Sequence, residues 1–558
     1  MGIWKKYYLL GLVLLLAAIL RFWNLAGNPP GLTWDEAALG YNAYSLLQTG
    51  RDEYGNLLPL NLKSFGDWKP ALYAYLDIPF VAAFGLNELA VRLPSAIFGI
   101  LGVFGVFLLT QELFKKKGLA ILAAFLLAIS PWHLQFSRPA FEANVALTFN
   151  IFAVYIFLKA LVNKKLLIIS AFLFGLSLIT YQASKLFIPL VISGLMIIYW
   201  NRVKESKFAL YSLLILFGFL LMIAFTFFSG QTGRLVAQNF FAYQRSVEQN
   251  ELISKEDRLP SNGIRFNILH GQWWEYIRGL TERYLIYFSP KMLFVDGDYS
   301  QRHRVPDLGA LYYFSVILIP LGIIYLIRLG SKESRVVLTW LILAPLPAVL
   351  SRDLISILRA LNLVVPFAIL EATGLWWLIG WLRGNRGNKG NWAVPAGRQG
   401  NLGVGFIIII IFINFIIFID RYFVHAPHEY SKYWLYGYRE VVNEVVSLKD
   451  IYHKVVISDT YGQPYIYYLF YSKYPPDKFQ KQASLEQRTV DVGTVRNIDN
   501  IEFRHIFWPG DRGEKNTLFA GSLEELPDKD ILPFKEFNLV KDINFLNGEE
   551  AFRIVITR

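Results

Sequence analysis

Residues 93–129 read LPSAIFGILGVFGVFLLTQELFKKKGLAILAAFLLAI, two long apolar runs separated by three consecutive lysines. Each run is long enough, or nearly so, to cross the hydrocarbon core of a bilayer, which takes about 20 apolar residues in a helix. Basic residues beside membrane spans are retained on the cytoplasmic side. This stretch therefore predicts two transmembrane helices whose connecting turn, at Lys115 to Lys117, faces the cytoplasm.

The composition of the whole chain fits a membrane protein. Of the 558 residues, 54% are hydrophobic and only 18% are charged, and the mean hydropathy is +0.37. These values exclude a soluble protein. The chain contains no Cys, which excludes disulfides, thiolate metal sites and cysteine nucleophiles.

The net charge of +12 reports topology and not a nucleic-acid partner. Residues 421–558 hold 18 Lys and Arg against 20 Asp and Glu, so residues 1–420 hold the remaining 37 and 23. The positive excess thus lies entirely in the hydrophobic part of the chain, where basic residues flank membrane spans.

Eleven apolar runs are candidate spans, and basic residues occupy every second loop between them. An N-terminus inside the cell satisfies all six basic loops. The short apolar segment 71–85 would place the three lysines outside if it crossed, so we predict that it is a re-entrant or interfacial helix on the outer face. The eleven runs begin near Tyr7, Leu93, Gly118, Phe141, Leu166, Lys185, Phe208, Leu311, Val336, Ile357 and Gly403.

This topology places three segments outside the cell and one linker inside. The outer segments are a first loop, 21–92, a second loop, 230–310, and the tail, 421–558. The Gly- and Asn-rich residues 384–403 predict a cytoplasmic linker without a packed core. The first run also resembles a signal peptide, but no small-residue cleavage site follows it, so we expect an uncleaved span.

The tail has the pattern of a small α/β domain. Its predicted strands lie at 453–459, 517–521 and 552–558, and its predicted helices at 430–448 and 464–471. Residues 1–420 would then form the transmembrane domain and residues 421–558 an extracytoplasmic domain.

Two adjacent carboxylates, Asp35 and Glu36, open a predicted amphipathic helix just outside the first span. In one interpretation they serve the helix end, since Thr33 or Asp35 can accept its unpaired N–H groups and acids suit the positive end of the helix dipole. In the other, one acid is a general base that deprotonates an acceptor near the lipid interface, and its neighbour pairs with it or tunes it. The sequence leaves both interpretations open.

Lys69 and Arg138 each precede a proline at the start of a predicted outer-face helix. A cation there opposes the helix dipole and the positive-inside bias, so we expect an anion to compensate each. Free N–H groups and a cation together would bind a phosphate. The structural alternatives are an ion pair of Arg138 with Glu142 and a solvated lysine at position 69.

The second outer loop crowds charged residues before the eighth span. Asp296-Gly297-Asp298 is typical of an Asp-Gly turn and, more weakly, of an acidic pair that holds a divalent ion. The basic residues could reach a lipid phosphate or contact headgroups. This group comprises Asp296, Asp298, Arg302, His303 and Arg304.

Two further outer-face cations, Lys185 and Arg359, lie near the starts of the sixth and tenth spans, with the same two interpretations. No HExxH, P-loop or GxSxG motif is present. Zinc proteolysis, ATP-driven transport and serine hydrolysis therefore have no support.

Taken in order, several short motifs on the predicted outer face resemble those of the GT-C membrane glycosyltransferases related to protein O-mannosyltransferases and to aminoarabinose transferases. The resemblance covers most of residues 1–380. The matching residues are Asp35-Glu36, Trp68-Lys69-Pro70-Ala71-Leu72-Tyr73, Glu88 with Arg92-Leu93-Pro94-Ser95, Ser137-Arg138-Pro139, Gly297-Asp298 through Arg302-His303, and Arg359-Ala360-Leu361 before Pro366.

The resemblance implies a polyprenyl-phosphate sugar donor, an inverting transfer, an acidic catalytic base and no nucleotide. It makes Asp35 and Glu36 the catalytic candidates. The substrate-binding candidates are Lys69, Arg138, Lys185, Asp298, Arg302, His303 and Arg359. No cofactor is required, although a divalent metal has weak support from Asp298. Aminoarabinose transferases carry Glu-Lys-Pro where this chain has Trp68-Lys69-Pro70, which puts a lipid A substrate in doubt.

The sequence thus predicts a multi-pass enzyme of a bacterial-type inner membrane, with its N-terminus in the cytoplasm and its tail outside. It would transfer a sugar from a polyprenyl phosphate to a lipid, glycan or protein acceptor. A transporter or flippase of lipid-linked saccharides is the main alternative, and it would need charged residues or broken helices near the bilayer midplane. An inactive, receptor-like relative is the third possibility.

Overall fold

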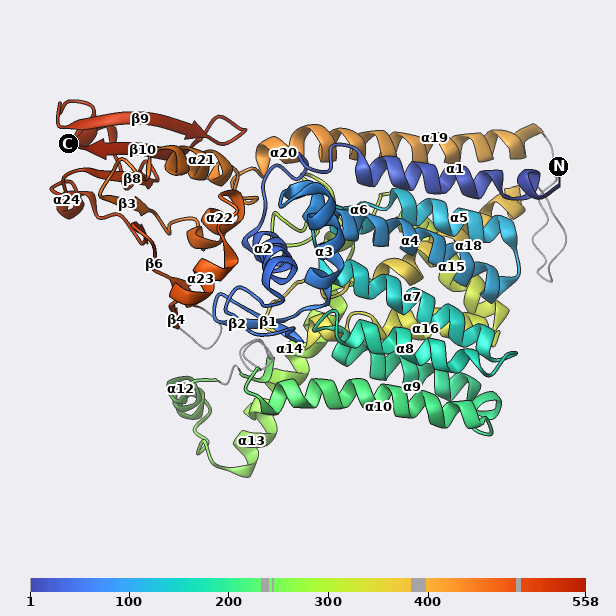
Figure 1. Cartoon of the computed structure of the whole chain (residues 1–558). Coiled ribbons are helices and arrows are strands. Elements are labelled where there is room, and N and C mark those ends of the chain that lie inside the picture. The colour runs from blue at the N-terminus through green and yellow to red at the C-terminus, as the bar shows by residue number, and fades with distance from the viewer. Residues whose placement is uncertain (1, 232–239, 243–244, 383–397, 488–492) are drawn as a thin grey trace.

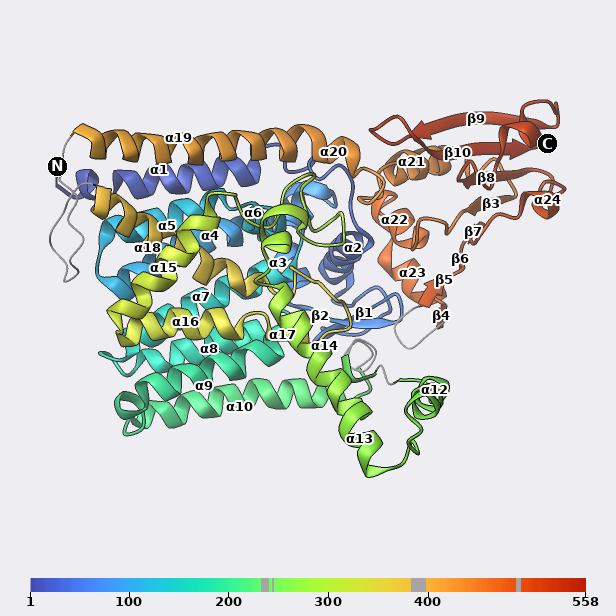
Figure 2. The ribbon, with the colours of Figure 1, turned by 180° about the vertical axis from the view of Figure 1, so that it is seen from behind.

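The structure of the chain is a computed structural model that describes residues 2–231, 240–242, 245–382, 398–487 and 493–558. Long helices run side by side as a bundle, with the N-terminus at one end and the C-terminal sheet beyond the other (Figure 1; Figure 2). The bundle helices are α1 (Gly2–Phe22), α4 (Glu88–Phe114), α5 (Lys117–Ile129), α7 (Glu142–Ala160), α8 (Leu166–Leu178), α9 (Ser184–Val203), α10 (Lys207–Phe228), α15 (Ser315–Leu329), α16 (Lys332–Leu343), α18 (Val364–Leu382) and α19 (Arg398–Asp420).

Each predicted apolar run overlaps one of these helices. Within the described residues, six helical stretches are long and apolar enough to cross a membrane. The others are shorter, so the exact count of eleven spans stays a prediction. Lys115 and Lys116 form the turn between α4 and α5, and Lys117 begins α5. Lys115 ends α4 in a left-handed conformation with φ of 51°.

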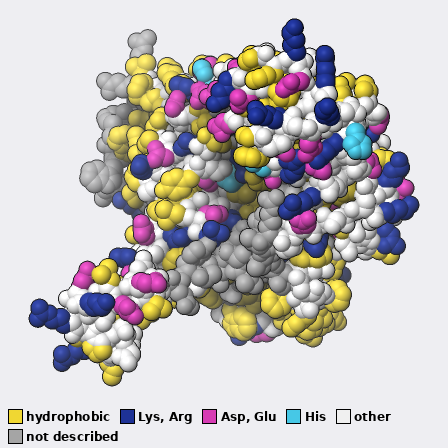
Figure 3. Space-filling view, turned by 90° about the vertical axis from the view of Figure 1, so that its left-hand side faces the viewer, with side chains coloured by type: hydrophobic (Ala, Val, Ile, Leu, Met, Phe, Trp, Pro, Cys, Tyr) yellow, Lys and Arg dark blue, Asp and Glu magenta, His cyan; other side chains and the backbone are white. Residues whose placement is uncertain are grey.

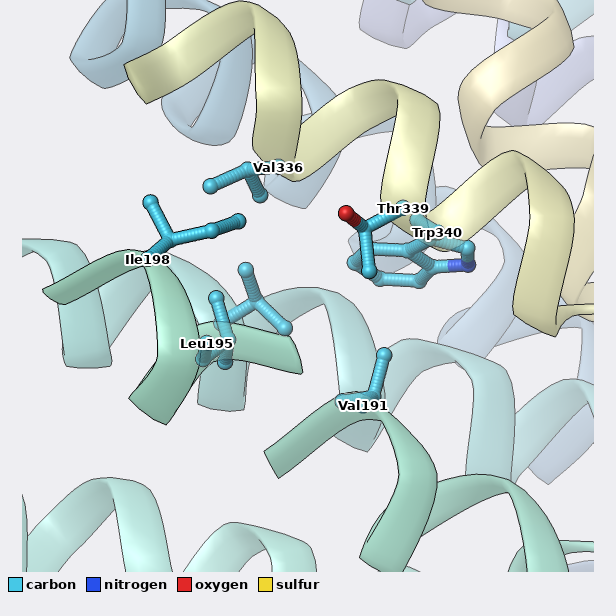
Figure 4. Close-up of a pocket in the computed structure, with 7 residues that line it drawn as sticks. Val191, Leu195, Ile198, Val336, Thr339 and Trp340 are labelled. Atoms are coloured by element: carbon cyan, nitrogen blue, oxygen red, sulfur yellow. The ribbon is translucent and has the colours of Figure 1, made fainter. Parts of the chain in front are cut away.

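Glycines permit a close contact between α15 and α18 in the bundle. A Cβ atom added at Gly374 would lie 2.1 Å from the carbonyl oxygen of Leu318, and one at Gly322 would lie 2.1 Å from that of Leu370. Small residues permit such backbone approach where lipid supplies no hydrophobic driving force between helices. A void of about 10 Å³ between α7, α9 and α16 is lined mostly by apolar side chains, with Thr339 among them, and has room for about one water molecule (Figure 4).

The predicted first outer loop folds against the end of the bundle nearest the C-terminal sheet (Figure 1). It contains α2 (Trp34–Thr49), the hairpin of β1 (Asn61–Ser64) and β2 (Asp67–Pro70), and α3 (Leu72–Phe84). The 13 residues of α3 span about 20 Å at 1.5 Å per residue, less than the thickness of the hydrocarbon core. This is the segment predicted as re-entrant or interfacial.

Shorter elements follow in the remaining loops. They are α6 (Pro131–Phe136), a 3-10 turn (Phe240–Ala242), α12 (Val247–Asp257), α13 (Ile264–His270), α14 (Gln272–Ile286), a π-helical turn (Met292–Asp296), α17 (Leu346–Val349) and a 3-10 turn (Leu361–Leu363). The predicted cytoplasmic linker, 384–403, lies mostly outside the described residues.

The tail contains a six-stranded mixed sheet in the order β6-β7-β3-β8-β10-β9. β3 is parallel to β7 and β8, and β10 is antiparallel to β8 and β9. The sheet strands are β3 (Lys454–Ile457), β6 (Asn497–Ile498), β7 (Ile501–Phe503), β8 (Thr517–Gly521), β9 (Phe537–Asn544) and β10 (Glu550–Thr557), with β4 (Leu485–Gln487) and β5 (Gly493–Val495) as a separate hairpin. The tail helices are α21 (Tyr438–Leu448), α22 (Pro464–Tyr471), α23 (Pro476–Gln482), α24 (Trp508–Asp511) and α25 (Asp528–Ile531).

The predicted start of the tail is displaced in the structure. Helical structure continues from α19 through a π-helical turn (Arg421–His425) and α20 (Ala426–Glu429). The helix predicted over 430–448 begins only at Tyr438, because Leu435 and Gly437 take positive φ values of 56° and 103° that interrupt it.

The tail and the first outer loop share one hydrophobic core. Side chains of α2, α3 and the start of α4 pack in the same cluster as those of α21, α22 and the sheet. Polar contacts join the same parts: the Tyr467 hydroxyl donates to the Leu32 carbonyl at 3.0 Å, and the Tyr471 hydroxyl to Glu88 at 3.0 Å. The tail therefore packs against the first outer loop, which carries Asp35 and Glu36, and supports it.

Candidate active site

A cavity of about 620 Å³ opens at the end of the bundle nearest the C-terminal sheet, the end that Figure 3 faces. It lies between the first turn of α2, β2, the starts of α7 and α9, the loop before α15 and the loop after α17. Five of the nine predicted site residues line it: Asp35, Lys69, Arg302, His303 and Arg359. One carboxylate, three cationic side chains and a histidine from distant parts of the sequence thus meet in one cavity.

Asp35 and Lys69 form an ion pair at the cavity wall. Asp35 lies in the first turn of α2, and its side chain is 42% exposed. Lys69 lies on β2 with its side chain only 5% exposed, and its ammonium group is 4.8 Å from the ring centroid of Phe65. The predicted anion beside Lys69 is therefore, at least in part, a carboxylate of the chain itself.

Glu36 is buried away from the cavity, which argues against the predicted catalytic role. Its carboxylate accepts hydrogen bonds from the backbone N–H groups of Thr33 (3.0 Å) and Ala140 (3.1 Å) and pairs with Arg92 at 3.0 Å. Thr33 and Glu36 form a capping box at the start of α2. The two interpretations of the acidic pair thus divide between its members, since Glu36 caps the helix and Asp35 faces the cavity.

Arg138 is also fully buried and does not line the cavity. Its guanidinium group donates to the carbonyl oxygens of Leu20 (2.6 Å), Trp23 (2.8 Å) and Asn28 (2.8 Å), among others. The Leu20 and Trp23 carbonyls lie at the C-terminal end of α1, where the helix dipole is negative, and the Asn28 carbonyl lies in the loop that follows. This geometry does not support phosphate binding by Arg138. The negative partner that the sequence predicts for Arg138 is a set of backbone carbonyls, and these occupy its N–H groups.

Asp298 holds the loop in front of α15 in place. Its carboxylate accepts from the N–H groups of Ser300 (2.9 Å) and Ile357 (2.9 Å) and contacts Nδ1 of His303 at 3.3 Å. Burial alone would raise the pKa of Asp298, but the His303 ring and these N–H donors outweigh it and hold the pKa below its usual value. The Asp-Gly turn interpretation fits this arrangement, since Gly297 has a φ of 68°.

Asp298 therefore acts on the cavity through His303, which lines it. The His303 ring packs against both Phe136 and Phe141, with ring centroids 5.4 Å and 5.9 Å away. Arg302, the next cavity residue, places its guanidinium carbon 4.9 Å from the ring centroid of Trp34. Among the residues that the structure describes, no three His, Asp or Glu side chains are grouped to hold a metal ion.

Arg359 and Lys185 approach the site from two other sides. Arg359 pairs with Asp353 and donates to the Ser351 hydroxyl at 3.1 Å. Lys185 lies in a neighbouring cavity of about 190 Å³, and its ammonium group donates to Gln182 Oε1 at 2.6 Å. Gln182 itself lines the main cavity, so Lys185 is one side chain removed from it.

The sequence did not indicate several other cavity residues. Trp34, Tyr181, Gln182 and Asp353 line the same space, and so does Glu142, which entered only as a possible partner of Arg138. Tyr181 and Gln182 are the polar break between two apolar runs, the one signal that could have singled them out.

Part of the chain matches a known protein family. Residues 68–225 match the family model described as dolichyl-phosphate-mannose-protein mannosyltransferase. A search of curated protein sequences gives no match. The matched segment carries Lys69, Arg138 and Lys185, but it covers less than half of the chain.

Solved structures share the fold across the chain. The apo structure of ArnT from Cupriavidus metallidurans superposes with a TM-score of 0.55 at 11% identity, covering 99% of this chain and 97% of ArnT. ArnT bound to undecaprenyl phosphate gives a TM-score of 0.53 at 9% identity, covering 100% and 98%.

An archaeal oligosaccharyltransferase also shares the fold. AglB from Archaeoglobus fulgidus, in complex with an inhibitory peptide and a dolichol-phosphate, gives a TM-score of 0.52 at 13% identity, covering 99% of this chain and 74% of AglB. Against the apo form of the Archaeoglobus fulgidus enzyme, this chain spans 64% of the other's length at a TM-score of 0.51 and 15% identity. The family match and the shared fold of a multi-pass membrane protein confirm the predicted resemblance to the GT-C membrane glycosyltransferases.

Proposed function

We propose that the chain is an integral membrane glycosyltransferase that takes a sugar from a polyprenyl phosphate at the outer face and passes it, with inversion, to an extracytoplasmic acceptor. One observation carries the proposal: Asp35 and Lys69 form a pair that faces a cavity also lined by Arg302, His303 and Arg359. The solved relatives include one bound to undecaprenyl phosphate and one bound to a dolichol-phosphate, which supports a lipid-linked donor.

In this proposal Asp35 is the general base. Its carboxylate takes the proton of the acceptor O–H or N–H group as that atom forms a bond to the anomeric carbon. The bond from the anomeric carbon to the donor phosphate breaks on the opposite side, and its electron pair leaves with the phosphate oxygen. Lys69 pairs with this carboxylate and holds it at the cavity wall.

The cavity cations stabilise the leaving phosphate. Negative charge grows on the phosphate as the glycosidic bond breaks, and preorganised cations at that position lower the barrier. Arg302 and Arg359 supply fixed charge, and His303 supplies a further nitrogen donor oriented by Asp298. No step of the proposal requires a metal ion, and adding EDTA to the assay tests this.

The neighbouring cavity offers space for the lipid tail of the donor. It is mainly apolar, lies between α3, α9 and α10, and has Lys185 at its wall. Pro70 and Ala71, the residues directly after Lys69, line it as well. A phosphate near Lys69 would therefore place its prenyl chain beside the bundle helices, where apolar surface is available.

A transporter of lipid-linked saccharides has one observation in its favour. Glu371, in the bundle helix α18, is buried and accepts a hydrogen bond from Ser315 Oγ at 2.6 Å. An ionisable side chain within a span is a usual feature of transport pathways. Glu371 lies in the glycine-lined contact of α15 with α18 and does not line the main cavity, where the transferase proposal places the reaction.

One experiment separates the two proposals. The purified protein is reconstituted and offered a panel of polyprenyl-phosphate sugars with acceptor extracts, with and without EDTA. We expect release of free polyprenyl phosphate from at least one donor, and its loss in Asp35→Asn. Movement of intact donor across the bilayer, without release from any donor, would instead establish the transporter.

The proposed orientation places the N-terminus in the cytoplasm of a bacterial-type cell and the tail outside. It rests on the alternation of basic loops. Reporter fusions at Lys116 and after Glu429 should report opposite sides of the membrane. A cytoplasmic tail would remove the proposed outer-face site altogether.

A further inference from the structure

We infer that α14 is a membrane-surface helix whose exposed face lies on the outer leaflet of the bilayer. The helix belongs to the second outer loop, between α13 and the π-helical turn. It takes no part in the proposed chemistry, and none of its residues lines the main cavity. The inference concerns where this loop lies and which partner covers its exposed side chains.

The exposed residues of α14 follow helical spacing and therefore form a single stripe. One edge of the stripe is apolar: Trp273, Trp274, Ile277 and Leu285 are 45%, 44%, 48% and 60% exposed. The other edge is charged and holds Arg278 and Glu282. An apolar edge with tryptophans beside a charged edge is typical of a helix that lies in the plane of a membrane interface.

Other side chains of α14 already contact the protein. Tyr276 packs against Phe241 with ring centroids 5.1 Å apart, and the Tyr284 hydroxyl donates to the Ile342 carbonyl at 3.0 Å. Arg283 donates to the carbonyl oxygens of Ser351 (2.9 Å) and Asp353 (2.7 Å). These contacts fix the rotation of the helix, so the apolar stripe cannot turn inward without breaking them.

The position of the loop identifies lipid as the occupant. In Figure 1 and Figure 2, α13 and α14 lie at the outer end of α10. In α10 only Ser212 and Thr226 are buried, as expected for a helix that mostly faces lipid. Near its outer end Phe225, Phe227 and Phe228 are 66%, 51% and 85% exposed, so the apolar surface of α14 lies near a surface that is itself lipid-facing.

The loop also extends sideways, along the plane that a bilayer would occupy. The lowest lobe of the molecule in Figure 1 is formed by α12 and α13, and in Figure 3, seen from the outer end, the lowest lobe projects beyond the body of the molecule. On α13, Ile264, Ile268 and Leu269 are 81%, 56% and 60% exposed. Apolar side chains on a laterally projecting segment at the outer end of a span would meet the interfacial region of the outer leaflet.

This contact would tie the bilayer surface to the rim of the cavity. The carbonyls that Arg283 holds belong to Ser351 and Asp353, whose side chains contact Arg359 in the cavity wall. A shift of α14 relative to the membrane would therefore move the Arg359 side chain in the cavity wall.

The absence of Cys from the chain makes a direct test possible. Single-cysteine variants of the full-length protein carry a nitroxide spin label in nanodiscs of phosphatidylcholine and phosphatidylglycerol. Ile277→Cys samples the apolar edge and Glu282→Cys the charged edge of the same helix, while Glu251→Cys on α12, a helix with no buried residues, is the water reference. The collision rates of each label with oxygen and with a water-soluble nickel chelate are compared.

We expect the ratio of oxygen to nickel collisions to be several-fold higher at Ile277→Cys than at Glu251→Cys, with Glu282→Cys in between. Equal ratios at all three positions would overturn the inference, since the stripe would then face water. Low collision rates of both reagents at Ile277→Cys would also overturn it, because protein would then cover the stripe, as in contact with a second copy. Leu285→Cys repeats the measurement on the apolar edge if the label at position 277 disturbs folding.

Discussion

Asp35 and Glu36 are neighbours in sequence and have different surroundings in the structure. The sequence could place both at the start of a helix, because Thr33 three residues before Glu36 is the signature of a capping box. It could not tell which carboxylate turns toward a cavity, because the partners of Glu36, Arg92 and the Ala140 N–H group, come from elsewhere in the chain. Long-range contacts decide this assignment.

We expect Asp35→Asn to lower turnover by at least about a hundredfold, the usual effect of removing a positioned general base. Stability should change little, because Thr33 and Glu36 still cap α2. Turnover is measured as polyprenyl phosphate release and stability as the melting temperature. Activity above about a tenth of wild type would contradict the assignment.

Glu36→Gln is the matched control for that variant. It leaves the buried Arg92 without an ionic partner, and breaking a buried pair typically costs about 3 to 5 kcal/mol. We therefore expect a clear fall in melting temperature, with residual turnover in the molecules that remain folded.

Lys69 and Arg138 also have different surroundings, since Lys69 lines the cavity and Arg138 is buried away from it. Lys69→Ala removes a cation from the cavity wall and should weaken donor use about 10- to 150-fold, which corresponds to about 1.5 to 3 kcal/mol for a charge-assisted contact. Arg138→Ala leaves the α1 carbonyls without their donor, so it should lower stability and leave the donor KM of the folded protein near wild type. A raised donor KM in a stable Arg138→Ala protein would restore its predicted phosphate role.

At the scale of elements, apolar runs located the helices well because their length is set by the bilayer and by periodicity. The predicted strands in the tail overlap β3, β8 and β10. The remaining strands escaped prediction, since β6 and β7 are only 2 and 3 residues long and β9 has a mostly half-buried or exposed pattern. The displaced start of α21 depends on backbone conformations at Leu435 and Gly437 that residue type alone does not fix at Leu435.

The contact between α15 and α18 gives a prediction at this scale. Gly374→Ala would drive a methyl group into the Leu318 carbonyl, so the two helices must separate or rotate. We expect a marked drop in melting temperature in detergent or nanodiscs. Gly380→Ala, on the same helix with no atom within 4 Å of the added carbon, should be neutral or slightly stabilising. Equal stability of the two variants would show that the bundle absorbs the change.

For the whole molecule, the main difference from the sequence-based prediction is the relation of the tail to the rest. Composition alone divides the chain at residue 421, because charge and hydropathy change there. The structure instead joins the tail to the first outer loop through a common core and through the hydrogen bonds of Tyr467 and Tyr471. A sequence pattern reports what each segment buries, but it does not report which segment covers it.

This joint core predicts what the tail does for the site. A protein ending after Glu429 would expose the apolar face of α2 that α22 covers, and it would lose the partners of Leu32 and Glu88. We expect it to insert into membranes, because the bundle helices precede the cut, and to lose hydrogen-exchange protection in α2 together with turnover. The expected cause of the lost turnover is displacement of Asp35, since none of the tail residues that the structure describes lines the cavity.

A surface change in the tail distinguishes this support from an independent binding role. Phe507 is 64% exposed and Phe534 is 44% exposed, and neither belongs to the shared core. Phe507→Ser and Phe534→Ser should leave both α2 protection and turnover unchanged. Tyr467→Phe removes the hydroxyl that holds the Leu32 carbonyl at the entrance to α2, so it should lower turnover with the tail still folded. Full turnover and α2 protection in the shortened protein would show that the tail is a separate module and that the first loop holds Asp35 in place unaided.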